Sequence, residues 1–334
     1  MSAAVIGAPV QRGVLPPIVG ASAALRETVA LAQRFAATDV PILLVGPTGT
    51  GKELFASHIH EWSGVRGELV DVNCATQPRE LVDAQLFGCR RGAYTGAVES
   101  TPGLIEAADG GTLFLDELCS LSLEAQAKLL RVVETGEFRR LGETTKRRAD
   151  FRLVAATQRL DPAGIEARVL RADLVQRLAG VIVELPPLAN RLEDVIALAE
   201  HFAGAAGKVL APSALDVLCG YRWPGNVREL RRVIERAACL ARDGTLDAAT
   251  VSRGIALGQA NGARIETALA GEPSGPWLAR VIVAGRRHAW HAGRMAAALR
   301  INRATLFRRL KAARSSIRQL QELAMYCAQT NGKK

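Results

Sequence analysis

The chain has 334 residues, of which 49% are hydrophobic and 23% are charged, a composition typical of globular proteins. At roughly 150 residues per domain, this length predicts about two domains. The longest run without a charged residue, 13–25, contains two prolines and is shorter than the roughly 18 residues of a membrane helix. A transmembrane segment is therefore excluded. Because the N-terminus also shows no secretory signal pattern, we expect a cytoplasmic protein with no membrane partner.

The net charge of +10 is concentrated near the C-terminus. Segment 281–320 contains ten Arg and Lys residues and no Asp or Glu, so the remainder of the chain is neutral overall. A basic segment on a neutral body is typical of a module that binds a polyanion. The six cysteines show neither CxxC nor paired His spacing, which argues against a zinc site and a disulfide framework.

Short apolar segments alternate with helical patterns in the first half of the chain. The expected strands are 41–45, 69–72, 112–115, 152–157 and 181–185. This alternation predicts an α/β fold with a parallel sheet covered on both faces. After Pro186 and Pro187 the strand signals stop, and a small all-α domain is expected. Its predicted helices are 191–207, 213–220, 226–241 and 247–256.

Proline and glycine content suggests where these parts begin and end. Residues 1–17 hold three prolines and two glycines and are expected to form a flexible lead. Residues 258–276 are rich in Gly, Ala, Ser and Pro, which is typical of a linker. The predicted parts are therefore a lead (1–17), an α/β core (18–187), a helical lid (188–257), a linker (258–276) and a basic C-terminal module (277–334).

A glycine-rich loop directly follows the first expected strand, and a helical pattern follows the loop. Its residues are Gly46, Pro47, Thr48, Gly49, Thr50, Gly51, Lys52 and Glu53. Strand, loop and helix in this order are the context of a phosphate-binding loop, in which backbone N–H groups surround the phosphates and Lys52 reaches the terminal ones. By itself, the same pattern also fits an ordinary glycine turn.

The third expected strand ends in two carboxylates, Asp116 and Glu117. Such a pair completes a nucleotide site, with Asp116 holding Mg²⁺ and Glu117 polarising the attacking water. A strand that ends in Asp-Glu can also be a solvated sheet edge. Both halves lie at strand ends in the expected order, and the carboxyl ends of parallel strands are where open α/β sheets bind ligands. The sequence therefore predicts an ATP site with Mg²⁺.

Between these two halves the chain reads LFGCRRGAYTGA (86–97), and here it resembles the sigma-54-dependent transcriptional activators, which are AAA+ ATPases with a GAFTGA loop. The resemblance extends over most of the chain from Ile18 to about Lys311. The other segments that carry it are VNCA (72–75), LLRVVETGEFRRLG (129–142), LRADLVQRL (170–178), LPPL (185–188) and YRWPGNVREL (221–230). It implies an AAA+ core with a helical lid, ATP and Mg²⁺ as cofactors, and a homohexamer when active.

In this family, the loop contacts sigma-54 when ATP is bound and couples hydrolysis to promoter opening. The matching residues are Gly92, Ala93, Tyr94, Thr95, Gly96 and Ala97. Tyr94 replaces the usual Phe, which keeps the ring and adds a hydroxyl. Without the resemblance, the segment would also fit a tight turn whose Tyr94 packs in its own core.

The resemblance also implies roles for residues outside the two nucleotide motifs. Asn73 matches the residue that restrains the catalytic Glu; alternatively, it is a buried, satisfied amide. Arg171 and Arg177 match the arginines that enter the neighbouring subunit's site; alternatively, they are solvated helix charges. Arg228 matches the sensor arginine of the lid; alternatively, it forms a surface ion pair with Glu229 or Glu235.

The chain departs from the family pattern in three places. Thr157 and Gln158 occupy the first sensor, where Asn usually follows Thr, so the longer Gln158 side chain shifts the amide. Ala189 and Asn190 replace two charged residues after LPPL. Arg300 stands at a turn position where Gly is typical.

Residues 291–313 show two helical patterns joined at 300–302, with Asn302 as the expected N-cap of the second. This segment resembles the Fis-type helix-turn-helix that ends most members of the family. Its second helix carries side chains suited to phosphates and major-groove base edges. They are Arg303, Thr305, Arg308, Arg309 and Lys311. A basic, solvated helical hairpin is the alternative.

The sequence thus predicts an ATP-hydrolysing activator that binds upstream DNA and remodels sigma-54 RNA polymerase. Two other classes stay open: a DNA-binding regulator with a vestigial ATPase, suggested by Gln158 and the altered hinge, and an AAA+ remodeller of another protein. Because no sensor domain is expected in the lead, control by expression level or by a regulator acting in trans is expected.

Overall fold

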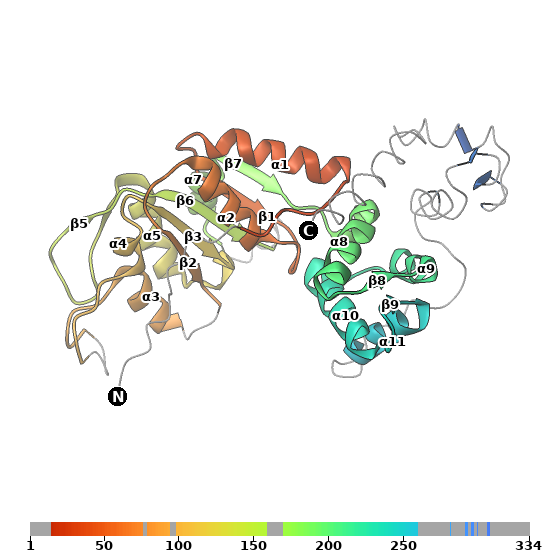
Figure 1. Cartoon of the computed structure of the whole chain (residues 1–334). Helices are drawn as coiled ribbons and strands as arrows, with labels where there is room; N and C mark the ends of the chain where they lie inside the picture. The colour runs from red at the N-terminus through yellow and green to blue at the C-terminus, as the bar shows by residue number, and fades with distance from the viewer. Residues whose placement is uncertain are drawn as a thin grey trace. The chain divides into compact units, whose positions relative to one another are not determined.

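The computed structural model describes residues 15–75, 79–93, 98–158 and 170–259, and eight positions nearer the C-terminus (Figure 1). These positions are Val281, His291, Ala292, Met295, Ala296, Leu299, Leu306 and Phe307. The chain divides into two compact units. The first contains Glu27–Leu185 and the chain up to Ile18, and the second contains Val19–Arg26 and the chain from Pro186 onward.

The first unit is built around a five-stranded parallel sheet in the order β2-β3-β6-β1-β7. Each strand lies within one or two residues of its expected position, so the prediction of a parallel α/β sheet is confirmed. Buried apolar runs such as ILLV specify these strands because both faces of the sheet are covered. The strands are β1 (Ile42–Val45), β2 (Leu69–Asn73), β3 (Thr112–Asp116), β6 (Arg152–Thr157) and β7 (Val181–Glu184).

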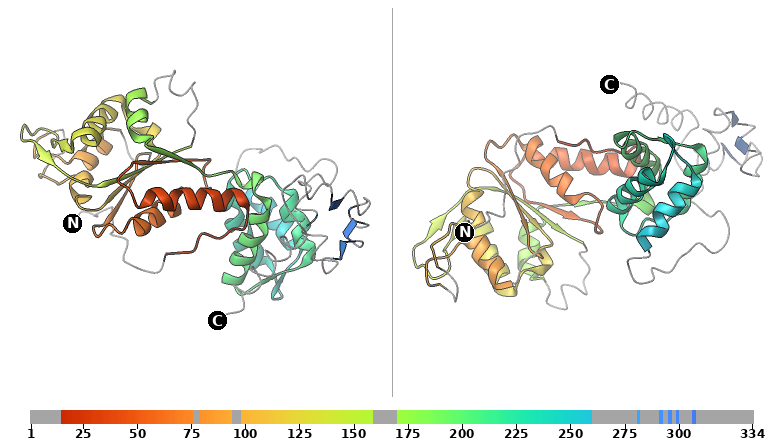
Figure 2. Two further views of the ribbon diagram at one scale, coloured as in Figure 1. Left: turned by 90° about the horizontal axis from the view of Figure 1, so that it is seen from above. Right: turned by 60° about the horizontal axis from the view of Figure 1, so that its bottom comes forward.

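Helices cover both faces of this sheet (Figure 2). Leu43, Leu113 and Leu153 point to one face, where they share an apolar cluster with side chains of α3, α5 and α7. Successive strand residues alternate in direction, so Ile42 and Phe114 point to the opposite face, where α1 and α2 lie. The helices of this unit are α1 (Ala23–Ala36), whose first four residues belong to the second unit, α2 (Lys52–Ser63), α3 (Arg79–Phe87), α4 (Leu104–Ala107), the 3-10 helix η1 (Leu118–Ser120), α5 (Leu123–Thr135) and α7 (Ala172–Leu178).

A small hairpin joins α5 to β6. Its strands, β4 (Glu137–Phe138) and β5 (Arg147–Arg148), pair antiparallel. Gly136, at φ 71°, ends α5 in the left-handed conformation that glycine adopts without steric cost. Phe138 is buried and belongs to the cluster on the α5 face of the sheet. The hairpin is therefore attached to the core at its base.

The second unit is mainly helical, as the sequence predicts. Its core contains Trp223, which is 1% exposed and donates from Nε1 to Leu218 O at 2.9 Å. A short parallel pair, β8 with β9, is also present and was not expected. The elements are η2 (Leu188–Asn190), α8 (Leu192–Ala205), β8 (Val209–Leu210), α9 (Pro212–Gly220), α10 (Asn226–Leu240), β9 (Thr245–Leu246) and α11 (Ala248–Gln259).

Asp194 of α8 binds the N-terminal segment of the same unit. Its carboxylate accepts from Ser22 N at 2.7 Å and Ser22 Oγ at 2.8 Å, and from Ala21 N at 2.5 Å. Arg191, also buried, lies 3.6 Å from the same carboxylate. Because a fully buried charge needs several polar partners, this cluster fixes Val19–Arg26 on the lid.

The described positions beyond 280 include five buried apolar residues, among them Met295 and Leu306, which belong to the apolar cluster of the lid. The expected DNA-binding residues Arg303, Thr305, Arg308, Arg309 and Lys311 lie outside the described residues, as does Arg300. Within the part of the chain that is described, no helix is long and apolar enough to cross a membrane.

Candidate functional site

Both halves of the expected nucleotide site lie at the carboxyl edge of the sheet. The glycine loop follows β1, Asp116 ends β3, Asn73 ends β2 and Thr157 ends β6. These four strands are neighbours, and Asn73 pairs in register with Asp116. Four sequence-distant segments therefore meet at one edge, which is the usual ligand position in open parallel sheets.

The glycine loop curls tightly between β1 and α2. Gly49 and Gly51 have φ angles of 81° and 105°, which side-chain-bearing residues rarely adopt. A Cβ at Gly46 would lie 2.7 Å from Leu185 O, so the close approach of the backbone at these two positions requires glycine. Thr50 Oγ1 donates to Pro47 O at 2.8 Å and closes the turn. The loop ends at Lys52, the first residue of α2, where helix N–H groups favour an anion.

Lys52 is directed into this loop. It is 6% exposed, and its ammonium donates to Gly46 O at 2.8 Å and to Pro47 O at 3.4 Å. The other loop residues are its neighbours in the sequence, among them Pro47, Thr48 and Glu53. A buried cation at a helix N-terminus is suited to phosphate oxygens.

Asp116 faces the same charge from β3. It is 7% exposed, and its Oδ1 accepts from Glu117 N at 2.9 Å. The pKa of Asp116 is raised, mainly by burial, although the Glu117 N–H and the Lys52 ammonium act in the opposite direction. A cation near the Asp116 carboxylate would favour its ionised form.

Glu117 follows in an unusual backbone conformation, with φ 54° and ψ 47°. Its carboxylate accepts two hydrogen bonds from Gln158 Nε2, at 3.0 Å to Oε1 and 3.2 Å to Oε2. The Oγ1 atom of Thr157, the residue before Gln158, lies 3.1 Å from Cys119 Sγ. The longer Gln158 side chain thus reaches the carboxylate expected to polarise water.

Polar groups of β2 border the carboxylates. Asn73 Oδ1 accepts from Ala75 N at 2.9 Å, and this amide is only partly buried. Asp71 is exposed as a residue, but loss of hydration around its carboxylate raises its pKa to about 6, and the charges of Glu53 and Asp116 add to the shift. Burial likewise raises the pKa of the Cys74 thiol to about 12, so this thiol stays protonated. Within the described residues, no group of three or more His, Cys, Asp or Glu could hold a metal ion.

The three expected arginines lie on helices or directly before one. Arg171 immediately precedes α7 and forms an ion pair with Asp173 at 2.7 Å, and Arg177 is exposed near the end of that helix. Arg228 lies in the first turn of α10. Glu229 accepts from Tyr221 Oη and Gly225 N, and Glu235 pairs with Arg231.

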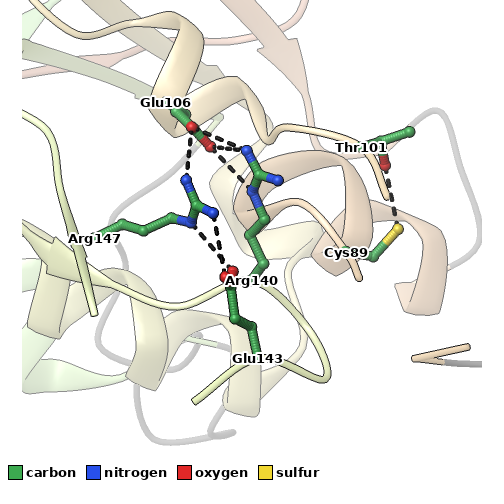
Figure 3. A network of polar contacts seen from close by, with 6 residues as sticks. All are labelled: Cys89, Thr101, Glu106, Arg140, Glu143 and Arg147. Atoms are coloured by element: carbon green, nitrogen blue, oxygen red, sulfur yellow. Dashed lines mark hydrogen bonds and ion pairs between the residues drawn. The ribbon is translucent and has the colours of Figure 1, made fainter. Parts of the chain in front are cut away.

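The GAYTGA segment is described only at its start, Gly92 and Ala93; Tyr94, Thr95, Gly96 and Ala97 lie outside the described residues. The stem of this loop is closed by backbone hydrogen bonds in both directions between Cys89 and Thr101, at 3.0 and 2.9 Å. Cys89 Sγ also lies 3.1 Å from Thr101 Oγ1 (Figure 3). The described residues on either side of the segment are therefore bonded to each other.

The hairpin that precedes β6 is bonded to this stem. Arg90 N donates to Leu141 O, and Leu141 N donates to Gly88 O, both at 2.9 Å. A Cβ at Gly142 would lie 2.9 Å from Ala93 Cβ, so hairpin and loop are in close contact. The hairpin continues into β6, whose end carries Thr157. A continuous stretch of chain thus joins the nucleotide edge to the loop stem.

A charge network on α4 binds both arms of the hairpin (Figure 3). Arg140 donates from Nε and Nη2 to the Glu106 carboxylate at 2.8 to 3.1 Å, and Arg147 donates to Glu106 at 3.1 Å and to Glu143 at 3.1 to 3.2 Å. The pairs of Glu106 with Arg140 and Arg147 could not be read from the sequence, because charges more than thirty positions apart leave no local pattern.

Comparison with known proteins agrees with this architecture. The Sigma-54 interaction domain family matches residues 18–184, and the AAA+ ATPase lid domain family matches residues 189–267. The fold is therefore that of an AAA+ ATPase-type domain with its lid. The chain belongs to the sigma-54-dependent activator family.

Relatives and solved structures support this assignment. The nitric oxide reductase transcription regulator NorR2 of Cupriavidus necator is 47% identical over 232 residues, 67% of this chain and 44% of NorR2. The Psp operon transcriptional activator of Escherichia coli is 42% identical over 239 residues, 69% of this chain and 73% of that protein. NtrX of Brucella abortus in complex with ADP has a TM-score of 0.69 and 31% identity, over 89% of this chain and 69% of NtrX. The chain spans about half the length of several of the curated relatives that it matches, NorR2 among them.

Proposed function

We propose that this protein hydrolyses ATP and uses the energy to remodel sigma-54 RNA polymerase at promoters. The observation that carries the proposal is the connection between the candidate nucleotide site and the stem of the GAYTGA loop. The hairpin bonded to the GAYTGA stem runs directly into β6, and Gln158 at the end of β6 binds Glu117. A change at the nucleotide edge therefore has a short, hydrogen-bonded route to the loop.

In this proposal, the backbone of Gly46–Gly51 and the N-terminus of α2 bind the phosphates, and Lys52 contacts the terminal ones. Glu117 orients and polarises the attacking water. NtrX, similar over most of this chain, has been solved with ADP and with ATP. The buried Lys52 charge fits a ligand of this kind.

Mg²⁺ would be held by Asp116. The donor set fits, because Mg²⁺ is usually bound by one or two carboxylates together with substrate phosphates and waters. Asp116 is buried, and its Oδ1 already accepts from Glu117 N, which fixes the carboxylate. When bound, the ion neutralises charge on the phosphates.

The active form is proposed to be a homohexamer in which Arg171 and Arg177 complete the neighbour's site, with Arg228 as lid sensor and Asn73 beside the carboxylates. The parts proposed are a lead (1–17), core (18–187), lid (188–257), linker (258–276) and DNA-binding module (277–334). Arg303, Thr305, Arg308, Arg309 and Lys311 would bind upstream DNA, and a regulator acting in trans would control the protein.

Binding to sigma-54 tests the assignment of the loop. Purified sigma-54 is titrated with the full chain in the presence of an ATP analogue that resists hydrolysis, and the same titration is made with Thr95→Ala. Binding by the wild type and at least tenfold weaker binding by the variant support the proposal. Equal binding by both proteins refutes the role of the GAYTGA loop, and no binding by either refutes the partner.

A further inference from the structure

The contact between Gln158 and Glu117 joins two residues whose backbones are both fixed. Gln158 directly follows Thr157, the last residue of the central strand β6, which pairs in register with Val45 of β1. Thr157 Oγ1 also lies 3.1 Å from Cys119 Sγ, in the helix that follows Glu117. The Gln158 side chain therefore extends from the rigid end of β6.

Glu117 is held on its own side by backbone contacts. Its N–H donates to Asp116 Oδ1 at 2.9 Å, and its carbonyl accepts from Ser120 N at 2.8 Å. Its left-handed backbone, at φ 54°, is unfavourable for a side-chain-bearing residue. With the backbone fixed in this way, rotation of the side chain is the available route by which the carboxylate changes direction.

Among the described residues, both side-chain hydrogen bonds accepted by this carboxylate come from Gln158 Nε2, one to each oxygen. A general base has to accept the proton of the attacking water on one of those oxygens, within hydrogen-bond distance. The carboxylate edge that faces Gln158 is occupied by the amide. Release from Gln158 would free this edge of the Glu117 carboxylate for the attacking water.

We propose that Gln158 is a positioning residue that restrains Glu117 and lowers the basal rate of ATP hydrolysis. The inference rests on the proposed ATPase function, which it deepens by naming how the rate is held down. An Asn at this position has one methylene fewer, so its amide would fall short of the carboxylate from the same strand end. The reach of the longer side chain is what makes the restraint possible.

The test is steady-state ATP hydrolysis by the full chain, without sigma-54 or DNA, at one fixed protein concentration. Gln158→Met keeps the length of the side chain and removes the amide donors. Loss of a solvent-accessible hydrogen bond to a charged group predicts a rise in kcat of about three- to tenfold. KM for ATP is expected to stay the same, because the phosphate loop is untouched. Gln158→Asn is expected to behave like Gln158→Met.

Matched variants separate restraint from a general structural effect. Gln33→Met makes the same substitution at an exposed position of α1 and is expected to leave kcat unchanged. Glu117→Ala with Gln158→Met is expected to be inactive, because the released group is absent. A kcat of Gln158→Met that equals or falls below wild type overturns the restraint, as does a rise that persists in the double variant. If the wild type and all variants hydrolyse no ATP, the proposed ATPase itself is refuted, and this inference falls with it.

Discussion

At the scale of single residues, the proposed site separates a group assigned to binding from a group assigned to catalysis. Lys52 is buried inside the glycine loop, where its ammonium donates to loop carbonyls, whereas Glu117 directly follows the end of β3. In the proposed function, loss of the Lys52 ammonium removes a contact to the bound nucleotide. Loss of the Glu117 carboxylate removes a contact that is made in the transition state, as water attacks.

We therefore expect Lys52→Ala to weaken ATP binding by more than tenfold, and Glu117→Ala to keep ATP affinity while losing at least 100-fold in kcat, since general base catalysis is worth about 10²–10⁴. Equilibrium titration with a fluorescent ATP analogue and a phosphate-release assay measure the two effects. Near-normal hydrolysis by Glu117→Ala would contradict its assigned role.

Asp71 supplies a pH-dependent prediction. Its folded-state pKa of about 6 lies above the ordinary value of 3.8, so the unfolded chain releases this proton first as pH rises. Asp71 therefore lowers the stability of the folded chain progressively between about pH 4 and pH 6. Asp71→Asn removes this cost and is expected to add up to about 1 kcal/mol at pH 7, after allowance for solvent screening.

Urea unfolding of wild type and Asp71→Asn at pH 4 and pH 7 measures this effect. The variant should match the wild type at pH 4 and exceed it at pH 7. A variant that is less stable than wild type at pH 7 would show that the ionised Asp71 carboxylate has a favourable partner in the folded protein.

At the scale of elements, the contact between hairpin and loop stem depends on one glycine. Gly142 has a φ of 73°, and a Cβ there would lie 2.9 Å from Ala93 Cβ. Gly207 has a similar φ of 67° but open space around its Cβ position. Alanine at either site carries the steric cost of the left-handed conformation, and only Gly142→Ala also displaces the loop.

We expect Gly142→Ala to retain ATP hydrolysis within about threefold of Gly207→Ala, while sigma-54-dependent promoter opening falls at least tenfold below that control. Both activities are measured on the same protein preparations, together with thermal unfolding. Equal promoter opening by the two variants would show that the contact at Ala93 does not contribute to coupling.

The five strands of the main sheet could be read from the sequence because each is a short, largely apolar run close to Gly, Pro or charged residues. The strands β4, β5, β8 and β9 could not, since two residues each are too few to show a period. The loop and the Asp-Glu pair were located because their chemistry depends on adjacent residues. The Glu106 network and the Gln158 contact depend on folding, which brings residues 34 to 41 positions apart together.

At the scale of the whole molecule, the proposed arginine contribution from a neighbour makes hydrolysis depend on assembly. ATP turnover per subunit is expected to rise steeply with protein concentration, while Arg177→Ala stays low at every concentration. Phosphate release measured across the assembly range, with particle mass followed in parallel, tests this expectation. A turnover per subunit that is constant while the mass changes would contradict shared sites.

The central claim is that ATP hydrolysis in the core is coupled to sigma-54 RNA polymerase through the GAYTGA segment. The most direct measurement is ATP-dependent open-complex formation on a sigma-54 promoter, with wild type and Thr95→Ala compared at matched ATP turnover. The account predicts open complexes with wild type and ATP, and at least tenfold fewer with the variant. ATP hydrolysis by the wild type without open complexes would contradict the claim.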